Sequence, residues 1–247
     1  AEDGTISLSG LSFSKNGKLA AFSISEGGSD WRKVIVMDAL NKKVIEDTLM
    51  DIKFSGIQWE LNEGFFYSSY DKPEGSELSE MTDQHKLYFH KLGTPQSDDV
   101  LIFGGTPDEK HRYVGASVTE DGKYLFISAS KTTSGNVSFL KDLSKENSPL
   151  LLVDQDYSTD SYLLDSMGEQ LFIVTNSNAP KQKVVQVNAN RPQEKNWKDF
   201  IPETDHVLSP SSGGGYFFAR YIVDVITKVV QYNAQGENLG EVELPGL

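Results

Sequence analysis

The chain has 247 residues, of which 23 are basic and 36 acidic, so its formal net charge is −13. This charge argues against nucleic acids and anionic membranes as partners, whereas a cationic or neutral ligand fits it. The absence of cysteine excludes disulfide scaffolds, thiolate metal sites and a cysteine nucleophile. No apolar stretch approaches the ~18 residues of a membrane span and no signal-like segment opens the chain, so we expect a soluble protein of the cytoplasm or a bacterial periplasm.

A glycine-aromatic phrase recurs along the chain. Its glycines stand at positions 17, 64, 122, 168 and 214, which lie 47, 58, 46 and 46 residues apart. A repeat of about 40 to 50 residues built from strands is typical of propeller blades. The five copies are Asn16–Ser23, Asn62–Ser68, Asp121–Ser128, Met167–Ile173 and Gly214–Ala219.

Each phrase predicts a hairpin, because Asn-Gly or Asp-Gly supplies the positive φ angles of a tight turn and the run that follows favours a strand. Strands are also predicted before the turns, at Gly10–Ser14, Ile52–Glu60 and Val114–Glu120. Two more follow them, such as Arg32–Ala39 with Lys42–Leu49 and Asn136–Leu143 with Pro149–Asp154. We therefore predict an all-β propeller with five four-stranded antiparallel blades, at 5–49, 50–106, 107–156, 157–204 and 205–247.

The second repeat is longer because of an insertion, Asp71–Gln84. Its proline, glycine, serines and acidic residues favour a solvated loop over a strand. Loops of this length are often functional, but a mobile surface excursion is the favoured explanation.

Motifs of catalysis are missing from the sequence. It contains no Gly-x-Ser-x-Gly elbow, no P-loop and no dinucleotide fingerprint, and four scattered histidines do not define a triad. His85 and His90 lie five residues apart, an offset that places strand residues on opposite faces, so we expect two surface histidines and no shared metal.

One acidic stretch imitates the ligand spacing of a calcium loop, but Thr159 replaces the required glycine and Asp165 stands where glutamate is preferred. Acidic residues in a connection between blades explain the stretch adequately. We predict no metal and no cofactor. The stretch comprises Asp154, Asp156, Ser158, Asp160 and Asp165.

Beyond the period, three phrases are more specific: Ser25–Trp31, Ile52–Trp59 and His85–Asp99. Their order continues through Phe103–Asp108 and through Asn196–Lys198 before Ile201. Together they resemble the propeller domain of the prolyl oligopeptidase family, over essentially the whole chain.

The resemblance implies a seven-bladed propeller over the mouth of an α/β-hydrolase domain that carries a Ser-Asp-His triad and cleaves short peptides after proline. This chain then supplies five blades. Its partners are the hydrolase domain and short proline-containing peptides, and without that domain it is inactive. Composition and blade count alone would instead favour a free-standing propeller that binds other proteins.

The resemblance also implies roles for single residues. Phe54 matches an aromatic that lines the apolar subsite beyond the proline pocket, although most strand phenylalanines are core residues. Tyr113 occupies another lining position, often a methionine. Ser130 and Thr133 stand where some members have an arginine and a cysteine that reach substrate, so a contact here is weaker or water-mediated. Asp30 matches an acidic residue that faces the hydrolase domain, or it caps a turn.

A propeller that lacks two blades exposes two apolar faces, and exposed faces favour self-association. We expect the candidates for these faces to come from the first and fifth repeats. They are Leu19, Phe22, Val34, Val36, Phe217, Phe218, Val229 and Val230.

Overall fold

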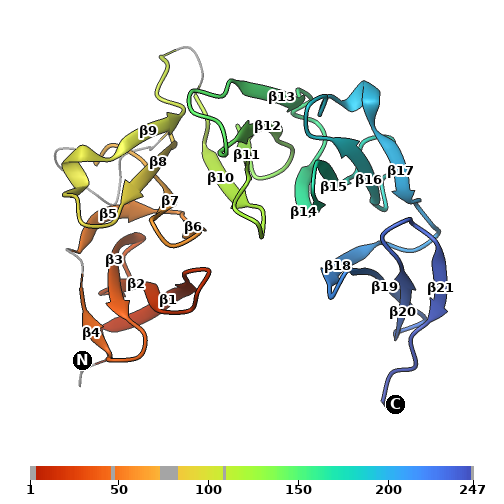
Figure 1. Ribbon diagram of the computed structural model, residues 1–247, viewed down its shortest axis with the longest axis horizontal. Coiled ribbons are helices and arrows are strands. Elements are labelled where there is room, and N and C mark those ends of the chain that lie inside the picture. Colours follow the sequence, from red (N-terminus) through yellow and green to blue (C-terminus); the bar gives the residue numbers. More distant parts are fainter. Residues whose placement is uncertain (1–3, 46–47, 73–82, 108–109, 246–247) are drawn as a thin grey trace. The chain divides into compact units, whose positions relative to one another are not determined.

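The computed structural model describes residues 4–45, 48–72, 83–107 and 110–245. Within them the chain forms five antiparallel sheets in sequence order (Figure 1). The prediction of an all-β fold with five four-stranded sheets is confirmed, and the first sheet holds one additional two-residue strand.

The first two sheets come from the N-terminal part of the chain. In the first, β1 (Ile6–Phe13), β2 (Leu19–Glu26), β3 (Trp31–Asp38) and β4 (Lys43–Val44) follow one another, and β5 (Leu49–Lys53) also pairs with β3. The second holds β6 (Gln58–Glu60), β7 (Gly64–Ser69), β8 (Lys86–Lys91) and β9 (Val100–Phe103). A 3-10 turn, η1 (Gln96–Asp98), precedes β9. Most of the predicted loop Asp71–Gln84, residues 73–82, lies outside the described residues.

The remaining three sheets are regular meanders. The third holds β10 (Tyr113–Val118), β11 (Tyr124–Ser130), β12 (Val137–Asp142) and β13 (Leu150–Asp154). The fourth holds β14 (Ser161–Met167), β15 (Gln170–Thr175), β16 (Lys183–Asn188) and β17 (Lys198–Ile201), with the 3-10 turn η2 (Glu194–Asn196) before β17. The fifth holds β18 (Ser209–Gly213), β19 (Tyr216–Val223), β20 (Ile226–Tyr232) and β21 (Asn238–Glu241).

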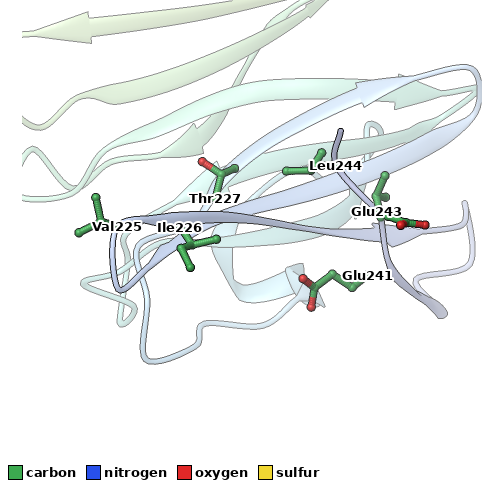
Figure 2. Close-up of a pocket in the computed structure, with 7 residues that line it drawn as sticks. Val225, Ile226, Thr227, Glu241, Glu243 and Leu244 are labelled. Carbon is green, nitrogen blue, oxygen red and sulfur yellow. The ribbon is translucent and has the colours of Figure 1, made fainter. Parts of the chain in front are cut away.

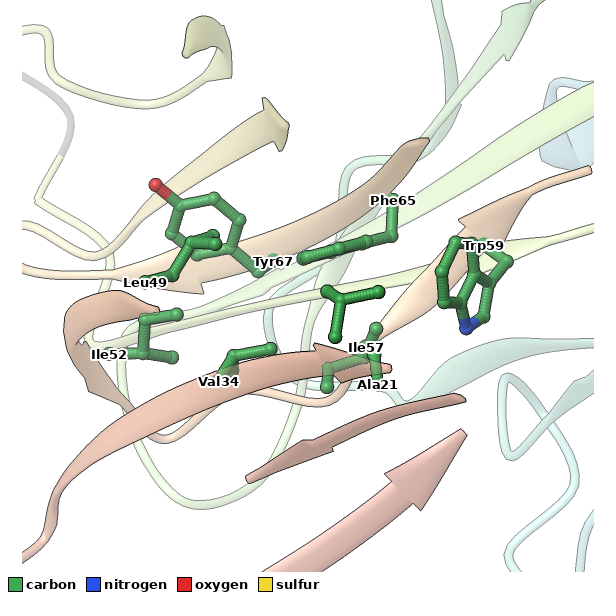
Figure 3. Packing of buried hydrophobic residues seen from close by; sticks show 9 residues of the cluster. Ala21, Val34, Leu49, Ile52, Ile57, Trp59, Phe65 and Tyr67 are labelled. Atoms are coloured by element: carbon green, nitrogen blue, oxygen red, sulfur yellow. The ribbon is translucent and has the colours of Figure 1, made fainter. Parts of the chain in front are cut away.

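The chain divides into two compact units, residues 1–133 and 134–247. In the first unit, one core joins the first and second sheets (Figure 3). Val34 of β3 and Ile52 of β5 meet Phe65 and Tyr67 of β7, and Figure 3 shows their side chains pointing into the same layer. Because both contacting faces are apolar, this packing holds the two sheets face to face.

A similar core joins the fourth and fifth sheets in the second unit. Phe172 of β15, Phe200 of β17 and Phe217 of β19 form a ring cluster with centroids 4.4 to 4.7 Å apart. All three side chains are buried. Aromatic clusters of this kind contribute beyond their buried area.

The predicted turn chemistry is correct at four of the five phrases. Gly17, Gly122, Gly168 and Gly214 have φ of 69°, 74°, 60° and 60°. Gly64 differs, because the positive φ of its turn lies at Leu61, with φ 50°.

Gly64 begins β7 and serves a different need. A Cβ atom there would stand 2.3 Å from the carbonyl oxygen of His90 on β8. The glycine is therefore required for close approach of two strands, and not for the turn.

The predicted strand Ile52–Glu60 is wrong, because the structure divides it between two sheets. β5 ends at Lys53 beside β3, and β6 starts at Gln58 beside β7. The break coincides with Phe54, whose φ is 53°. Left-handed backbone departs from the extended geometry of a strand, and the pairing with β3 does not continue past Lys53. The strand predicted at Lys42–Leu49 is likewise two pieces, β4 and the start of β5.

The first sheet presents an apolar face that lies opposite the one packed on the second sheet. A bulge between Leu8 and Gly10 keeps the apolar residues of β1 on this face, where they pair with even-numbered residues of β2. The exposed fractions are 43% for Ile6, 65% for Leu8 and 54% for both Leu11 and Phe13.

Five of the eight residues predicted for the open faces lie in the cores instead. Val34, Val36 and Phe217 are fully buried within the units. Leu19 and Val230 pack against the same cores. Phe22 pairs with Leu11 on the open face of the first sheet. Phe218 and Val229 lie on the face of the fifth sheet opposite Phe217 and Val230, since side chains alternate along a strand.

A groove of about 740 Å³ lies beside the turn between β19 and β20 (Figure 2). Val225 and Ile226 form one end, and Glu241 and Glu243 supply its acidic groups. None of the residues that the resemblance singles out lines it. In the described part of the chain, no helix is long and apolar enough to cross a membrane.

Candidate functional site

The candidate site begins at the link between the first two sheets. Phe54 stands directly after β5, in left-handed backbone with φ 53° and with 42% of its side chain exposed. The alternative that Phe54 is a core residue is thereby wrong. A bulky residue in this conformation is a genuine outlier, and such outliers persist only where the surroundings hold them.

Hydrogen bonds hold the backbone on both sides of Phe54. The amide of Lys53 donates to the Ser69 hydroxyl at 3.2 Å, and the hydroxyl of Ser55 accepts from the amide of Ser68 at 2.7 Å. The carbonyl of Lys53 accepts from the His85 ring, with the two atoms 2.9 Å apart. The link is thus tied to β7 and to the residue before β8.

Tyr113, at the start of β10, meets Phe54 edge to face. The ring centroids are 5.8 Å apart with an interplanar angle of 65°. Phe54 also contacts Tyr70 edge to face at 6.4 Å. The Tyr70 hydroxyl donates to the carbonyl of Arg112, the residue before Tyr113. We call Phe54 and Tyr113 the aromatic pair.

Ser130 joins the aromatic pair through the third sheet. It stands directly opposite Tyr113 in the β10–β11 register, so the two side chains share one face. Its carbonyl accepts from the amide of Arg112 at 2.8 Å. Thr133 is exposed three residues further along, in the loop after β11. The structure therefore brings Phe54, Tyr113 and Ser130 together, and leaves Thr133 on the adjoining loop.

Two cations flank the aromatic pair in a chain whose net charge is −13. The Lys53 ammonium lies 5.3 Å from the Phe54 ring centroid and 5.0 Å from that of Trp31. The Arg112 guanidinium carbon lies 5.6 Å from the ring centroid of Tyr113. Cation–π contacts of this kind favour defined ring positions. The site is thus apolar at its centre and positive at its rim.

His85 is one of two histidines for which the predicted surface position is wrong. It was expected on the surface, but only 1% of it is exposed. Its Nδ1 accepts from the amide of Val114 at 2.8 Å, and its Nε2 donates to the carbonyl of Lys53. The ring stacks on Tyr70 with centroids 4.3 Å apart. Burial lowers the pKa of His85 to about 4, although the bond to Lys53 acts in the opposite direction.

His90 is also buried and not a surface residue, and it belongs to a separate network. Its Nδ1 lies 2.8 Å from Asp99, whose other carboxylate oxygen accepts from the Tyr67 hydroxyl at 2.7 Å. Burial and this carboxylate raise the pKa of Tyr67. The network fastens β7 and β8 to the segment before β9.

Asp30 lies on the exposed turn between β2 and β3. The side-chain hydrogen bonds within this turn come from its serines. The Ser25 hydroxyl donates to the carbonyl of Ser29 at 2.6 Å, and the Ser29 hydroxyl accepts from the amide of Trp31 at 3.1 Å. Asp30 itself is exposed, next to the start of β3.

The acidic stretch after β13 is organised by backbone turns. Asp154 accepts from the amide of Asp156 at 3.0 Å, and Asp156 accepts from the amide of Ser158 at 2.8 Å. Asp160 accepts from the amide of Gly135 at 2.8 Å. Among the described residues, no three His, Cys, Asp or Glu side chains gather closely enough to hold a metal ion.

Comparison with known proteins identifies the class to which this fold and site belong. The model of the prolyl oligopeptidase N-terminal β-propeller domain matches residues 1–247. The chain therefore belongs to the prolyl oligopeptidase family, as the resemblance predicts.

Individual relatives agree with this assignment. The chain is 49% identical over its whole length to the prolyl endopeptidase of Elizabethkingia miricola, of which it covers 35%. It is 32% identical to prolyl oligopeptidase A of Galerina marginata, with 98% of this chain and 36% of that protein covered.

Two solved structures resemble the chain closely. One, from a mechanistic analysis of two prolyl endopeptidases, has a TM-score of 0.88 and 31% identity, and the match covers 99% of this chain and 35% of that one. The other, prolyl oligopeptidase B of Galerina marginata bound to a 35-residue substrate, has a TM-score of 0.87 and 27% identity over 98% of this chain and 36% of that one. The chain thus spans about a third of the length of the relatives it matches.

Proposed function

We propose that this chain is the gating propeller and one wall of the substrate cavity in a serine endopeptidase that cleaves short peptides after proline. The catalytic triad in this proposal is carried by an α/β-hydrolase domain outside the 247 residues. The propeller contributes no reacting group. It contributes apolar surface, restricts access, and orients the peptide against the hydrolase domain.

One observation supports the proposal best: two aromatic rings are held together in a position that leaves one of them 42% exposed. A phenylalanine that served packing alone would be buried, as most phenylalanines are. An exposed, rigid ring instead offers area for an apolar side chain or blocking group with little loss of conformational entropy.

The other candidates extend this surface. Tyr113 widens the apolar wall, and the Ser130 hydroxyl offers one donor and an acceptor next to it. Thr133 reaches the peptide from the loop after β11. Arg112 and Lys53 carry the positive charge that the positions of Ser130 and Thr133 lack. Asp30 pairs with a basic group of the hydrolase domain across the interface between the two domains.

The test is Phe54→Ala in the full-length protein. We expect kcat/KM to fall for peptides with an apolar group three residues before the cut. The fall should correspond to a loss of about 1 to 3 kcal/mol of transition-state stabilisation, the value of a lost apolar subsite contact. Shorter peptides without that group should be cleaved as before. An equal loss for both peptides would show that Phe54 supports folding and does not contact substrate.

A further inference from the structure

We infer that His85 is the positioning residue of the aromatic pair, and that its neutral Nε2–H tautomer sets the distance between Phe54 and Tyr113. The inference rests on the proposed function and adds a residue to it. His85 lies behind the rings, is 1% exposed, and touches no substrate in this arrangement.

The first argument is connectivity. His85 binds the carbonyl of Lys53, which is bonded directly to the nitrogen of Phe54, at 2.9 Å. It binds the amide of Val114, which follows Tyr113, at 2.8 Å. One imidazole thus spans the backbones of both aromatic residues, which are 59 positions apart in sequence.

The second argument is the chemistry of the two partners. A backbone amide only donates and a carbonyl only accepts, so Nδ1 is the unprotonated nitrogen and Nε2 carries the hydrogen. Only this tautomer satisfies both bonds. A protonated ring would set an N–H of His85 against the N–H of Val114.

The third argument is that His85 itself is held in place. Tyr70 stacks on its ring and donates to the carbonyl of Arg112, so the same tyrosine links His85 to the start of β10. The His85 amide donates to the carbonyl of His111 at 2.9 Å. A Cβ atom on Gly104 would come within 2.8 Å of the His85 carbonyl oxygen, so that backbone is closely enclosed.

The activity test compares His85→Phe with His90→Phe in the full-length protein. His85→Phe keeps a flat ring against Tyr70 but removes both hydrogen bonds. His90 is an equally buried histidine five residues further along, in β8, and its bond to Asp99 does not involve the aromatic pair. Two peptides are used, one with and one without an apolar group three residues before the proline cut.

For His85→Phe we expect kcat/KM to fall about tenfold on the longer peptide, mainly through KM, and to stay within about twofold on the shorter one. His90→Phe should change both peptides by the same factor. If His85→Phe also changes both peptides equally, the positioning role is wrong. If the unchanged protein cleaves neither peptide, the proposed function is wrong, and the positioning role of His85 is wrong with it.

A second measurement does not depend on activity or on the variants folding. Nitrogen-15 spectra of the histidines in the unchanged full-length protein should show His85 as the Nε2–H tautomer at pH 7. In a separate activity comparison, the variants His85→Gln and His85→Asn should each keep one of the two bonds and lose less kcat/KM than His85→Phe on the longer peptide. An Nδ1–H tautomer for His85 would overturn the inference.

Discussion

At the scale of single residues, Phe54 adopts a backbone conformation that costs free energy. A non-glycine residue in left-handed backbone costs of order 1 to 3 kcal/mol. The bonds of Lys53 to Ser69 and His85, and of Ser55 to Ser68, offset it. Local strain therefore exists where the proposed substrate contact lies.

His85 should make the free energy of unfolding depend on pH. Its pKa is about 4 in the folded chain, against an ordinary value of 6.5. Above pH 6.5 the imidazole is neutral in both states, so the stabilisation is fully present. Between pH 6.5 and 4 the unfolded chain takes up a proton that the folded chain excludes, so stability falls by about 3 kcal/mol over this window.

Urea unfolding at pH 7 and pH 4, with the full-length protein and with its His85→Gln variant, measures this contribution. Other groups titrate in both proteins, so the difference between their pH dependences reports His85. We expect the variant to lose about 3 kcal/mol less than the unchanged protein between the two pH values. Equal losses would mean that His85 is protonated while folded.

Only some of these residues could be predicted from the sequence. The resemblance singled out Phe54, Tyr113 and Ser130, which the structure brings together. It could not show that His85 connects them, because a histidine after a polar loop has the local pattern of a surface residue. His85 is enclosed by partners distant in sequence, the carbonyls of Lys53 and His111 and the amide of Val114, and His90 pairs with Phe65 of β7.

At the scale of elements, the hairpin phrases predicted the sheets because turn and strand signals are local. The turn signal was misleading where a tertiary contact requires the glycine, as at Gly64, which allows the close approach of β8. The strand signal was misleading at Ile52–Glu60, where an apolar run with strand propensity passes from one sheet to the next. No local pattern marks the left-handed residue between them.

Phe65 of β7 should be a principal contributor to the core of the first unit. It is fully buried and contacts the rings of Trp59, Tyr67 and His90. We expect Phe65→Ala to lower the free energy of unfolding by about 3 to 5 kcal/mol, since it leaves a cavity between two sheets. Phe13→Ala, at a residue 54% exposed, is the matched control, and a loss as large as that of Phe65→Ala would contradict this picture of the core.

The loop that carries Thr133 should depend on Gly135. Its φ is 74°, and a Cβ atom would stand 1.8 Å from the carbonyl oxygen of Tyr157. Gly168 also has positive φ, 60°, but open space around it. We expect Gly168→Ala to cost about 1 kcal/mol and Gly135→Ala at least ~2 kcal/mol more, because backbone must move. Similar melting temperatures for the two variants would show that the loop yields freely.

At the scale of the whole molecule, the open apolar face of the first sheet predicts self-association of the 247-residue chain. Ile6, Leu8, Leu11 and Phe13 lie together there and are exposed. Contiguous apolar surface of this kind favours contact with a second copy.

Size exclusion with light scattering should therefore show dimers or larger species. The double variant Leu8→Lys and Leu11→Lys should shift the chain toward monomer. The control double variant, Lys18→Glu and Lys42→Glu, should not. If the unchanged chain is a monomer, the prediction that this apolar face drives self-association is wrong.

In the proposed function, this chain is part of a proline-specific peptidase and supplies no catalytic group. The most direct measurement compares the full-length protein with residues 1–247 on one fluorogenic peptide cut after proline. The account predicts turnover and labelling by a serine-directed phosphonate for the full-length protein, and neither for the 247-residue chain. Turnover by the purified chain, with the label on one of its own serines, would contradict the claim, as would a full-length protein that leaves the peptide intact.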